Sequence, residues 1–326
     1  MGDASANYAD RAQKLENVER ITGGFAGFGY ISSPRISTAV FLAQQLEKPI
    51  LVEGPAGVGK TELAKTAAAY LGLPLIRMQC YEGLDESKAL YEWKYAKQLL
   101  YTQILKEHLH ALTGGATNLN DALARLEDLD DIFFSEQFLE PRPLLGALRE
   151  PRGCVLLIDE IDKADEEFEA FLLEILSDYQ VSVPELGTIK AMVSPLVFLT
   201  SNNTREMSDA LKRRCLHLHI PFPDRTLETE IVAERVPEVP ERLRQQLVDF
   251  VQGLRGLDLR KQPSVAETID WARTLLLMHT DELGPDIVRN TLNVLLKFEE
   301  DIEVAEKEVA QLVRTARDPS SVLRYV

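Results

Sequence analysis

The residues from Gly54 to Thr61 could bind the phosphates of a nucleotide. They read GPAGVGKT and fit the pattern G-x-x-x-x-G-K-[ST] without a mismatch. The glycines allow successive backbone N–H groups to converge on phosphate oxygens. Lys60 can then reach the β- and γ-phosphates, and the Thr61 hydroxyl can ligand Mg²⁺. This stretch therefore predicts a binding site for ATP and Mg²⁺. Its residues are Gly54, Pro55, Ala56, Gly57, Val58, Gly59, Lys60 and Thr61.

Two adjacent carboxylates follow a continuous apolar run further along the chain. The run from Cys154 to Ile158 is typical of a central parallel strand covered on both faces. In open α/β sheets, ligands bind at the carboxyl ends of the strands. We therefore expect Asp159 to hold Mg²⁺ and Glu160 to act as the base that orients the attacking water. The alternative is that the charged pair only begins the next helix.

Three consecutive cations, Lys212 to Arg214, interrupt an acidic chain. The protein has 52 Asp and Glu against 36 Lys and Arg, a formal net charge of -16. Taken alone, the three cations are explained by the end of a helix, because positive side chains suit the negative end of the helix dipole.

The elements that must position these groups alternate between strand and helix. Ile50 to Val52 is a short apolar strand, and the residues from Thr61 to Gly72 are strong helix formers. Gln180 to Ala191 predicts a hairpin, and Pro195 to Thr200 a further buried strand. This alternation predicts an α/β fold with a central parallel sheet.

The C-terminal part of the chain has helical periodicity throughout. Pro221 and Pro223 close the preceding strand and predict a boundary near residue 223. We expect an N-terminal tail or helix over residues 1–20, an α/β core over 21–223 and a small all-helical domain over 224–326.

Composition excludes several classes of protein. No apolar run approaches the length of a membrane span, and the N-terminus lacks the apolar segment of a secretory signal. Cys80, Cys154 and Cys215 are far apart in apolar surroundings, which favours buried thiols in the cytoplasm. The net charge of -16 disfavours binding to nucleic acid, which needs a basic surface.

Four motifs in this order resemble those of the MoxR-like AAA+ ATPases: GPAGVGKT, LLIDEIDKA, FLTSNN and DALKRRCLHLHIPFPD. The resemblance covers roughly residues 20 to 320 and implies a P-loop AAA+ core, a helical lid, ATP hydrolysis and a hexameric ring. It also implies that Asn202 takes the sensor-1 position, which helps hold the lytic water. Asn203 is the alternative if the register shifts by one residue.

The same resemblance gives the cations a role. Arg214 matches the arginine finger that one subunit lends to its neighbour, and Arg213 is the close second. A guanidinium supplied in trans neutralises charge on the transferring phosphoryl group. Arg260 is the candidate for sensor 2, with Lys261 second. The family pattern at this place is a small residue, then Ser-Pro-Arg, and the stretch LRKQPSVAE departs from it. A structural flank of the helix is the alternative.

The resemblance further implies protein partners. The stretch YEGLDESKALYEWKYAKQLL looks like the helix-2 insert of the group, and Gln180 to Ala191 looks like its pre-sensor-1 hairpin. Such ATPases commonly act with a partner that bears a von Willebrand factor A domain. One branch serves metalloenzyme maturation, including that of molybdenum carbon monoxide dehydrogenase. The expected function is a chaperone-like ring motor that remodels a client protein or matures a metalloenzyme. A nucleotide-gated switch with slow hydrolysis and a DNA-associated ATPase stay open as alternatives.

Overall fold

The computed structural model describes residues 10–101, 103, 136–184 and 186–318. The chain divides into two compact units. The first contains the described residues of Met1–Gln13, Leu42–Leu51 and Leu71–Leu216. The second contains those of Lys14–Phe41, Val52–Tyr70 and His217–Val326. The phosphate-loop segment therefore belongs to the same unit as the C-terminal helices, and the predicted boundaries at residues 20 and 223 remain predictions.

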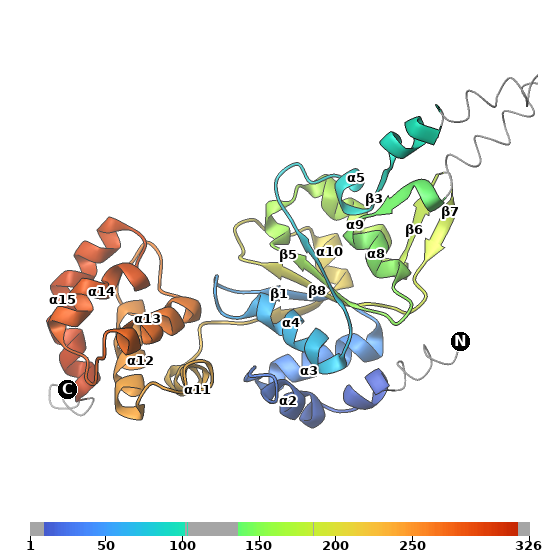
Figure 1. Cartoon of the computed structure of the whole chain (residues 1–326). Coiled ribbons are helices and arrows are strands. Elements are labelled where there is room, and N and C mark those ends of the chain that lie inside the picture. Colours follow the sequence, from blue (N-terminus) through green and yellow to red (C-terminus); the bar gives the residue numbers. More distant parts are fainter. Residues whose placement is uncertain (1–9, 102, 104–135, 185, 319–326) are drawn as a thin grey trace, which may run out of the picture. The chain divides into compact units, whose positions relative to one another are not determined.

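A five-stranded sheet has the strand order β2-β5-β8-β1-β9. Figure 1 labels its three inner strands, β5, β8 and β1. Its strands are β1 (Ile50–Glu53), β2 (Leu75–Gln79), β5 (Val155–Asp159), β8 (Leu196–Ser201) and β9 (Leu216–His219). β2 pairs with β5 in parallel, and β5 pairs with β8 in parallel. The register sets Gln79 beside Asp159, so the carboxyl ends of β2 and β5 meet at one edge. The predicted α/β fold with a central parallel sheet is confirmed.

β5, an interior strand between β2 and β8, is buried along its whole length, as a strand covered on both faces must be. Its side chains share a core with α8 (Pro143–Arg149) and α9 (Glu166–Asp178). α9 begins at the cap Asp165, whose carboxylate accepts a hydrogen bond from the backbone N–H of Phe168 at 2.8 Å. This cap ends the loop that follows β5 and fixes where the helix starts.

Two small antiparallel sheets accompany the first unit. β3 (Tyr91–Trp93) pairs with β4 (Leu139–Pro141), and β6 (Gln180–Val183) pairs with β7 (Gly187–Lys190). The second pair confirms the hairpin predicted from Gln180 to Ala191. The remaining short elements are α5 (Glu86–Ala89), η1 (Glu136–Phe138), η2 (Ile161–Lys163) and α10 (Asp209–Arg214).

The described segments before β1 and directly after the phosphate loop are helical. Of the predicted N-terminal tail or helix, residues 1–9 lie outside the described part of the chain, and residues 10–14 are helical. α2 (Val18–Ala26), α3 (Pro34–Leu46) and α4 (Lys60–Leu71) follow. Phe25 of α2 packs edge-to-face against Tyr70 of α4, with ring centroids 5.7 Å apart.

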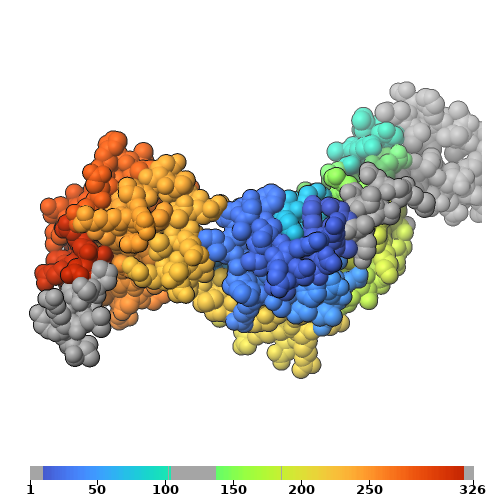
Figure 2. Space-filling model, turned by 90° about the horizontal axis from the view of Figure 1, so that it is seen from below, coloured from blue at the N-terminus to red at the C-terminus, as the bar shows by residue number. Residues whose placement is uncertain are grey.

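The C-terminal region is helical, as predicted, and Figure 2 shows its segments, coloured orange to red, in mutual contact. The helices are α11 (Arg225–Arg235), α12 (Glu241–Arg255), α13 (Val265–Leu277), α14 (Pro285–Leu295) and α15 (Glu299–Arg317). Their apolar faces form a separate core in which Phe250 and Trp271 lie 5.3 Å apart. In the part of the chain that the structure describes, no helix is both long enough and apolar enough to span a membrane.

A buried charge network joins three of these helices. Glu228 of α11 is fully buried, and its carboxylate accepts two hydrogen bonds from the Arg255 guanidinium, both at 2.7 Å. The same carboxylate accepts hydrogen bonds from Thr268 Oγ1 at 2.8 Å and from Gln252 Nε2 at 2.6 Å. Each carboxylate oxygen accepts two bonds, which compensates the desolvation of the charge.

Candidate functional site

The phosphate loop begins at Gly54, directly after β1. Gly54 has φ 150, and a Cβ atom there would lie 2.1 Å from the carbonyl oxygen of Ile220. No other residue fits this position, because any side chain would collide with backbone. The tight approach turns the chain away from the strand and into the loop.

The middle of the loop lies against the start of α13 within the second unit. Gly57 has φ 72, and a Cβ atom there would lie 2.3 Å from Ser264 Oγ. Ser264 caps α13: its backbone N–H donates to Glu267 Oε2 at 2.6 Å, and its hydroxyl accepts from the N–H of Glu267. This contact could not be predicted from the sequence, because no local pattern connects residues so far apart in the chain.

The loop lysine has the environment that phosphate binding requires. Lys60 is only 6% exposed, and its ammonium donates hydrogen bonds to the carbonyl oxygens of Gly54 and Pro55, both at 2.7 Å. Lys60 is also the first residue of α4, and Thr61 the second, so both stand at the positive end of the helix dipole. A buried cation at a helix N-terminus fits a nucleotide phosphate.

An aromatic ring lies beside the last glycine of the loop. A Cβ atom on Gly59 would lie 3.7 Å from the ring of Tyr30. Burial raises the pKa of the Tyr30 hydroxyl, and the charge of Glu62 adds to the effect. Glu62 of α4 in turn pairs with Arg235 of α11 at 3.0 Å. Tyr30 was missed in the sequence, where FGYISS has no motif to mark it.

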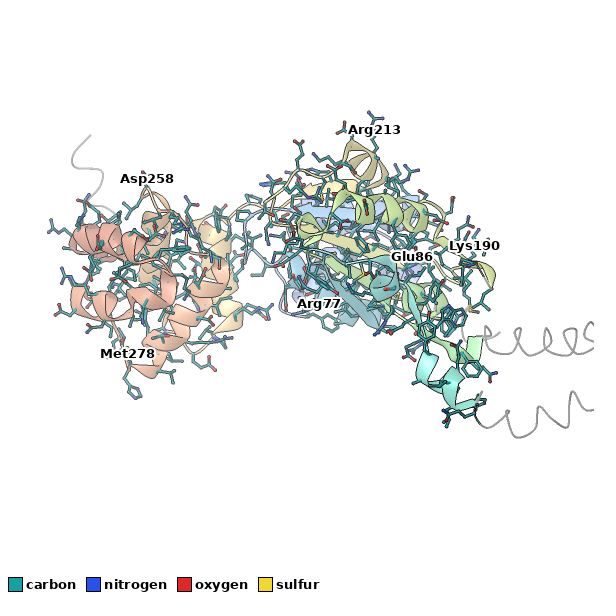
Figure 3. The ribbon with its side chains drawn as sticks, turned by 90° about the horizontal axis from the view of Figure 1, so that it is seen from above. Arg77, Glu86, Lys190, Arg213, Asp258 and Met278 are labelled. Atoms are coloured by element: carbon teal, nitrogen blue, oxygen red, sulfur yellow. The ribbon has the colours of Figure 1, made fainter. Side chains whose placement is uncertain are left out.

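Asp159 ends β5 in the first unit and is held by side chains from both neighbouring strands. It is buried, and its Oδ2 accepts hydrogen bonds from Arg77 Nη2 at 2.6 Å and Nε at 3.1 Å. Its Oδ1 accepts a hydrogen bond from the Thr200 hydroxyl at 2.5 Å. Arg77 lies on β2 and is labelled in Figure 3. Its role could not be predicted from the sequence, since nothing near Arg77 in the chain marks it as a partner of an acid.

Glu160 follows β5 with a left-handed backbone, φ 56 and ψ 50. Its N–H donates to Thr200 Oγ1 at 2.9 Å. Its carboxylate accepts hydrogen bonds from Gln79 Nε2 at 2.9 Å and from the ammonium of Lys163. The left-handed turn directs the side chain away from the strand, and these two donors hold it at the edge where β2 and β5 end.

The field at this edge is negative. Asp162 is buried with a lowered pKa: burial alone would raise it, but hydrogen bonds from the hydroxyl and N–H of Thr204 outweigh burial. The pKa of the Cys80 thiol is raised to about 12, first by burial and then by the charges of Asp159 and other acids nearby. The carboxylate oxygens of Asp159 are ligands of the type that Mg²⁺ prefers.

The two candidate sensor residues differ in conformation. Asn202 follows the last residue of β8 and is half-buried. Asn203 is exposed, has φ 60, and donates its N–H to Ser201 Oγ at 2.9 Å. The turn at Asn203 directs the chain away from the strand, so the geometry favours Asn202 for the sensor-1 position, which stays a prediction.

The two candidate finger arginines also differ. Both are exposed near the end of α10. Arg214 Nε donates to Ser177 Oγ of α9 at 2.5 Å. The Arg213 guanidinium makes no hydrogen bond or ion pair with any described residue, and Figure 3 shows the side chain projecting away from the ribbon. The finger role of either residue remains a prediction.

The sensor-2 candidates are held by other parts of the second unit. The Arg260 guanidinium lies 4.1 Å above the ring of Phe298. The backbone N–H groups of Arg260 and Lys261 donate to Asp301, and the Lys261 ammonium lies 3.7 Å from Glu267. The side chains that a Cβ atom on Gly57 would meet are instead those of Ser264 and Ala266. A sensor-2 role for Arg260 stays a prediction.

A phosphate loop with a buried lysine, together with an acidic pair at the end of an interior parallel strand, defines a P-loop nucleotide-binding protein. Residues 49–215 match the family model described as the AAA domain (dynein-related subfamily). The match covers more than half of the chain, and the chain belongs to this family.

Two relatives among curated proteins are uncharacterised proteins of Staphylococcus aureus. An uncharacterised protein of Staphylococcus aureus strain NCTC 8325 is 28% identical over 238 residues, which cover 71% of this chain and 76% of that protein. A counterpart in strain COL matches equally. Among solved structures, the Thermotoga maritima RuvB Holliday junction branch migration motor is similar with a TM-score of 0.45 and 19% identity, covering 88% of this chain and 75% of that chain.

Proposed function

We propose that this chain is an ATP-hydrolysing motor of the MoxR type that works as a hexameric ring in the cytoplasm. Its role in the proposal is chaperone-like remodelling, or maturation of a metalloenzyme, together with a partner that bears a von Willebrand factor A domain. The support is the ordered set of four motifs, the membership in the AAA family, and three free cysteines that are all buried.

The proposed chemistry assigns one task to each group. The loop N–H groups and Lys60 hold the phosphates of ATP, and the Thr61 hydroxyl and Asp159 carboxylate hold Mg²⁺. Mg²⁺, when bound, neutralises charge that develops on the phosphates. Glu160 orients and polarises the attacking water, and Asn202 helps to hold that water.

The observation that carries the proposal is the placement of Glu160. A purely structural acid at the start of a helix would cap it, yet Glu160 makes no side-chain cap to η2, and Asp165 caps α9 instead. The carboxylate is held at the ligand-binding edge of the sheet by Gln79 and Lys163. Groups positioned in this way support a hydrolytic role.

The arginines of α10 complete the proposal. Arg213 and Arg214 are exposed cations on a chain with net charge -16, and the family commonly assembles into rings. In a ring, either guanidinium can stabilise the transferring phosphoryl group of the next subunit.

One observation favours a second candidate, the nucleotide-gated switch with slow hydrolysis. Both acidic groups are already engaged by their own chain, Asp159 by Arg77 and Glu160 by Gln79 and Lys163. If these contacts persist when nucleotide binds, hydrolysis is slow, and the long-lived nucleotide-bound form of the protein acts as the switched state.

The test is the ATPase rate per protomer over a range of protein concentrations, for the wild type, Arg213→Ala and Arg214→Ala. The motor predicts a rate that rises with concentration and falls by about 10³-fold or more when the finger is removed. A slow rate that is independent of concentration and of both arginines would refute shared sites and favour the switch.

A further inference from the structure

An ion pair with a buried carboxylate and a partly exposed guanidinium joins α9 to the loop that leads to α10. Glu169 is 1% exposed, and its Oε1 accepts a hydrogen bond from Arg205 Nη2 at 2.5 Å. Its Oε2 accepts a hydrogen bond from the N–H of Ser208 at 2.9 Å. Arg205 Nη2 also donates to the carbonyl of Ala164 at 2.7 Å. A carboxylate buried this deeply is costly unless it is fully paired, and both of its oxygens are.

The same loop, residues 202–208, is anchored to the acidic edge at its beginning. Asp162 Oδ2 accepts hydrogen bonds from the hydroxyl of Thr204 at 2.6 Å and from its N–H at 3.1 Å. Asp162 stands two residues after Glu160, and Thr204 stands two residues after Asn202. Arg205 is the next residue, so the loop passes directly from the proposed catalytic groups to the Glu169–Arg205 pair.

At its other end the loop begins the helix that carries the arginines. Ser208 is the N-cap of α10, and its hydroxyl accepts a hydrogen bond from the N–H of Leu211. Arg214, the last residue of α10, donates to Ser177 of α9. α10 is therefore fastened to α9 at both ends, at its start through Glu169 and at its end through Arg214.

We propose that Glu169 and Arg205 form a positioning pair that sets the placement of α10, and through it the efficiency with which one subunit completes the site of the next. The partner is a second copy of this chain, and the inference rests on the proposed function. Neither residue is assigned a contact with nucleotide. They act on Arg213 and Arg214 through the backbone of α10.

The chemistry of the pair makes it sensitive to a single change. Both oxygens of Glu169 accept hydrogen bonds, one from Arg205 and one from Ser208. In Glu169→Gln the amide NH₂ of the new side chain must face one of these donors, so at least one contact is lost at almost unchanged volume. A shift of α10 by about 1 Å is enough to lower a rate by about 10²-fold.

Mixed rings separate this role from a general effect on folding. Donor subunits carry Glu160→Gln, so they supply arginines but do not hydrolyse ATP. Acceptor subunits carry Arg213→Ala with Arg214→Ala, so they hydrolyse ATP only beside a donor. Glu169→Gln is then placed in the donor or in the acceptor, and the ATPase rate of the mixture is measured. Glu174→Gln is the matched control, because it removes one negative charge from an exposed position of the same helix.

We expect Glu169→Gln to lower the rate of the mixture by about tenfold to 10²-fold in the donor and by less than about twofold in the acceptor. Equal losses in both positions, or no loss in the donor, would overturn the proposal. Arg205→Gln serves as a second variant if Glu169→Gln does not fold. Glu169→Gln and Arg205→Gln combined in the donor should lower the ATPase rate of the mixture no more than either change alone, because both break the same interaction. If the unmodified donor and acceptor fail to complement, the shared sites of the proposed function are refuted instead.

Discussion

Glu160 leaves β5 in a backbone conformation that non-glycine residues rarely adopt. Such a residue carries a strain of about 1–3 kcal/mol, which the surrounding structure must offset. The hydrogen bond from its N–H to Thr200, and those from Gln79 and Lys163 to its carboxylate, supply the offset. The side chain is thereby directed by the backbone and then held by neighbours, which limits its freedom before any ligand arrives.

We predict that Glu160→Gln binds ATP with little change but lowers the hydrolysis rate by about 10²- to 10⁴-fold, because the amide cannot accept a proton from water. Binding is measured with a fluorescent ATP analogue and turnover by phosphate release. Glu167→Gln, an exposed residue of α9, is the control and should keep full activity. Turnover by Glu160→Gln at the wild-type rate would remove Glu160 from the role of base.

Gly57 carries two constraints, a left-handed backbone and contact with Ser264. Gly72 carries only the first, since it has φ 68 and no atom within 4 Å of an added Cβ. We predict that Gly72→Ala costs about 1–2 kcal/mol of stability and leaves ATP binding intact. Gly57→Ala should cost more and should weaken ATP binding, because the loop must shift away from α13. Urea unfolding and ATP titration of both variants test this, and equal effects on binding would show that the contact with Ser264 is unimportant.

At the scale of elements, the C-terminal helices depend on one buried acid. Glu228 receives hydrogen bonds from α12 and α13, so a single side chain of α11 determines how three helices meet. Arg255 also donates to the carbonyl of Pro263, the residue before the cap of α13. This network therefore extends to Ser264 and, through it, to the phosphate loop within the second unit.

We predict that Glu228→Ala destabilises the protein by about 3–5 kcal/mol, because it leaves the Arg255 charge buried without its partner. Glu230→Ala removes an exposed acid of the same helix and should change stability by less than about 0.5 kcal/mol. Thermal and urea unfolding of both variants give the comparison. A small effect of Glu228→Ala would mean that water replaces the lost carboxylate.

Local patterns in the sequence predicted the elements well and the contacts between them poorly. The phosphate loop and the acidic pair each lie in one continuous stretch where a strand, a polar group and a helix follow in order. Arg77, Gln79 and Ser264 were missed because each meets its partner only through the sheet or the helix packing. The choice between Arg213 and Arg214 was left open, since adjacent residues differ only in what the fold places beside them.

At the scale of the whole molecule, all three cysteines are free, buried and within the first unit. Burial is the main cause that raises the pKa of each thiol, Cys80, Cys154 and Cys215, from 9.0 to about 12. Burial likewise raises the pKa of Tyr30 and Tyr179. The folded state therefore binds these protons more tightly than the unfolded state. Their contribution to stability is complete below pH 9 and is lost as the pH rises toward 12.

We predict that the native protein is nearly unreactive toward a thiol reagent at pH 8, because the thiolate is the reactive form and burial disfavours it. Labelling should then proceed only through opening of the first unit, so its rate should rise with urea in step with unfolding. Glu230→Cys, which places a thiol on an exposed position of α11, should react at once and calibrates the reagent. A native cysteine that reacts as fast as this control, while the protein remains folded by circular dichroism, would show that its surroundings open without unfolding. A second measurement compares the urea midpoints of unfolding at pH 8 and pH 10. Because the pKa values of these groups are raised in the folded state, the midpoint should be lower at pH 10.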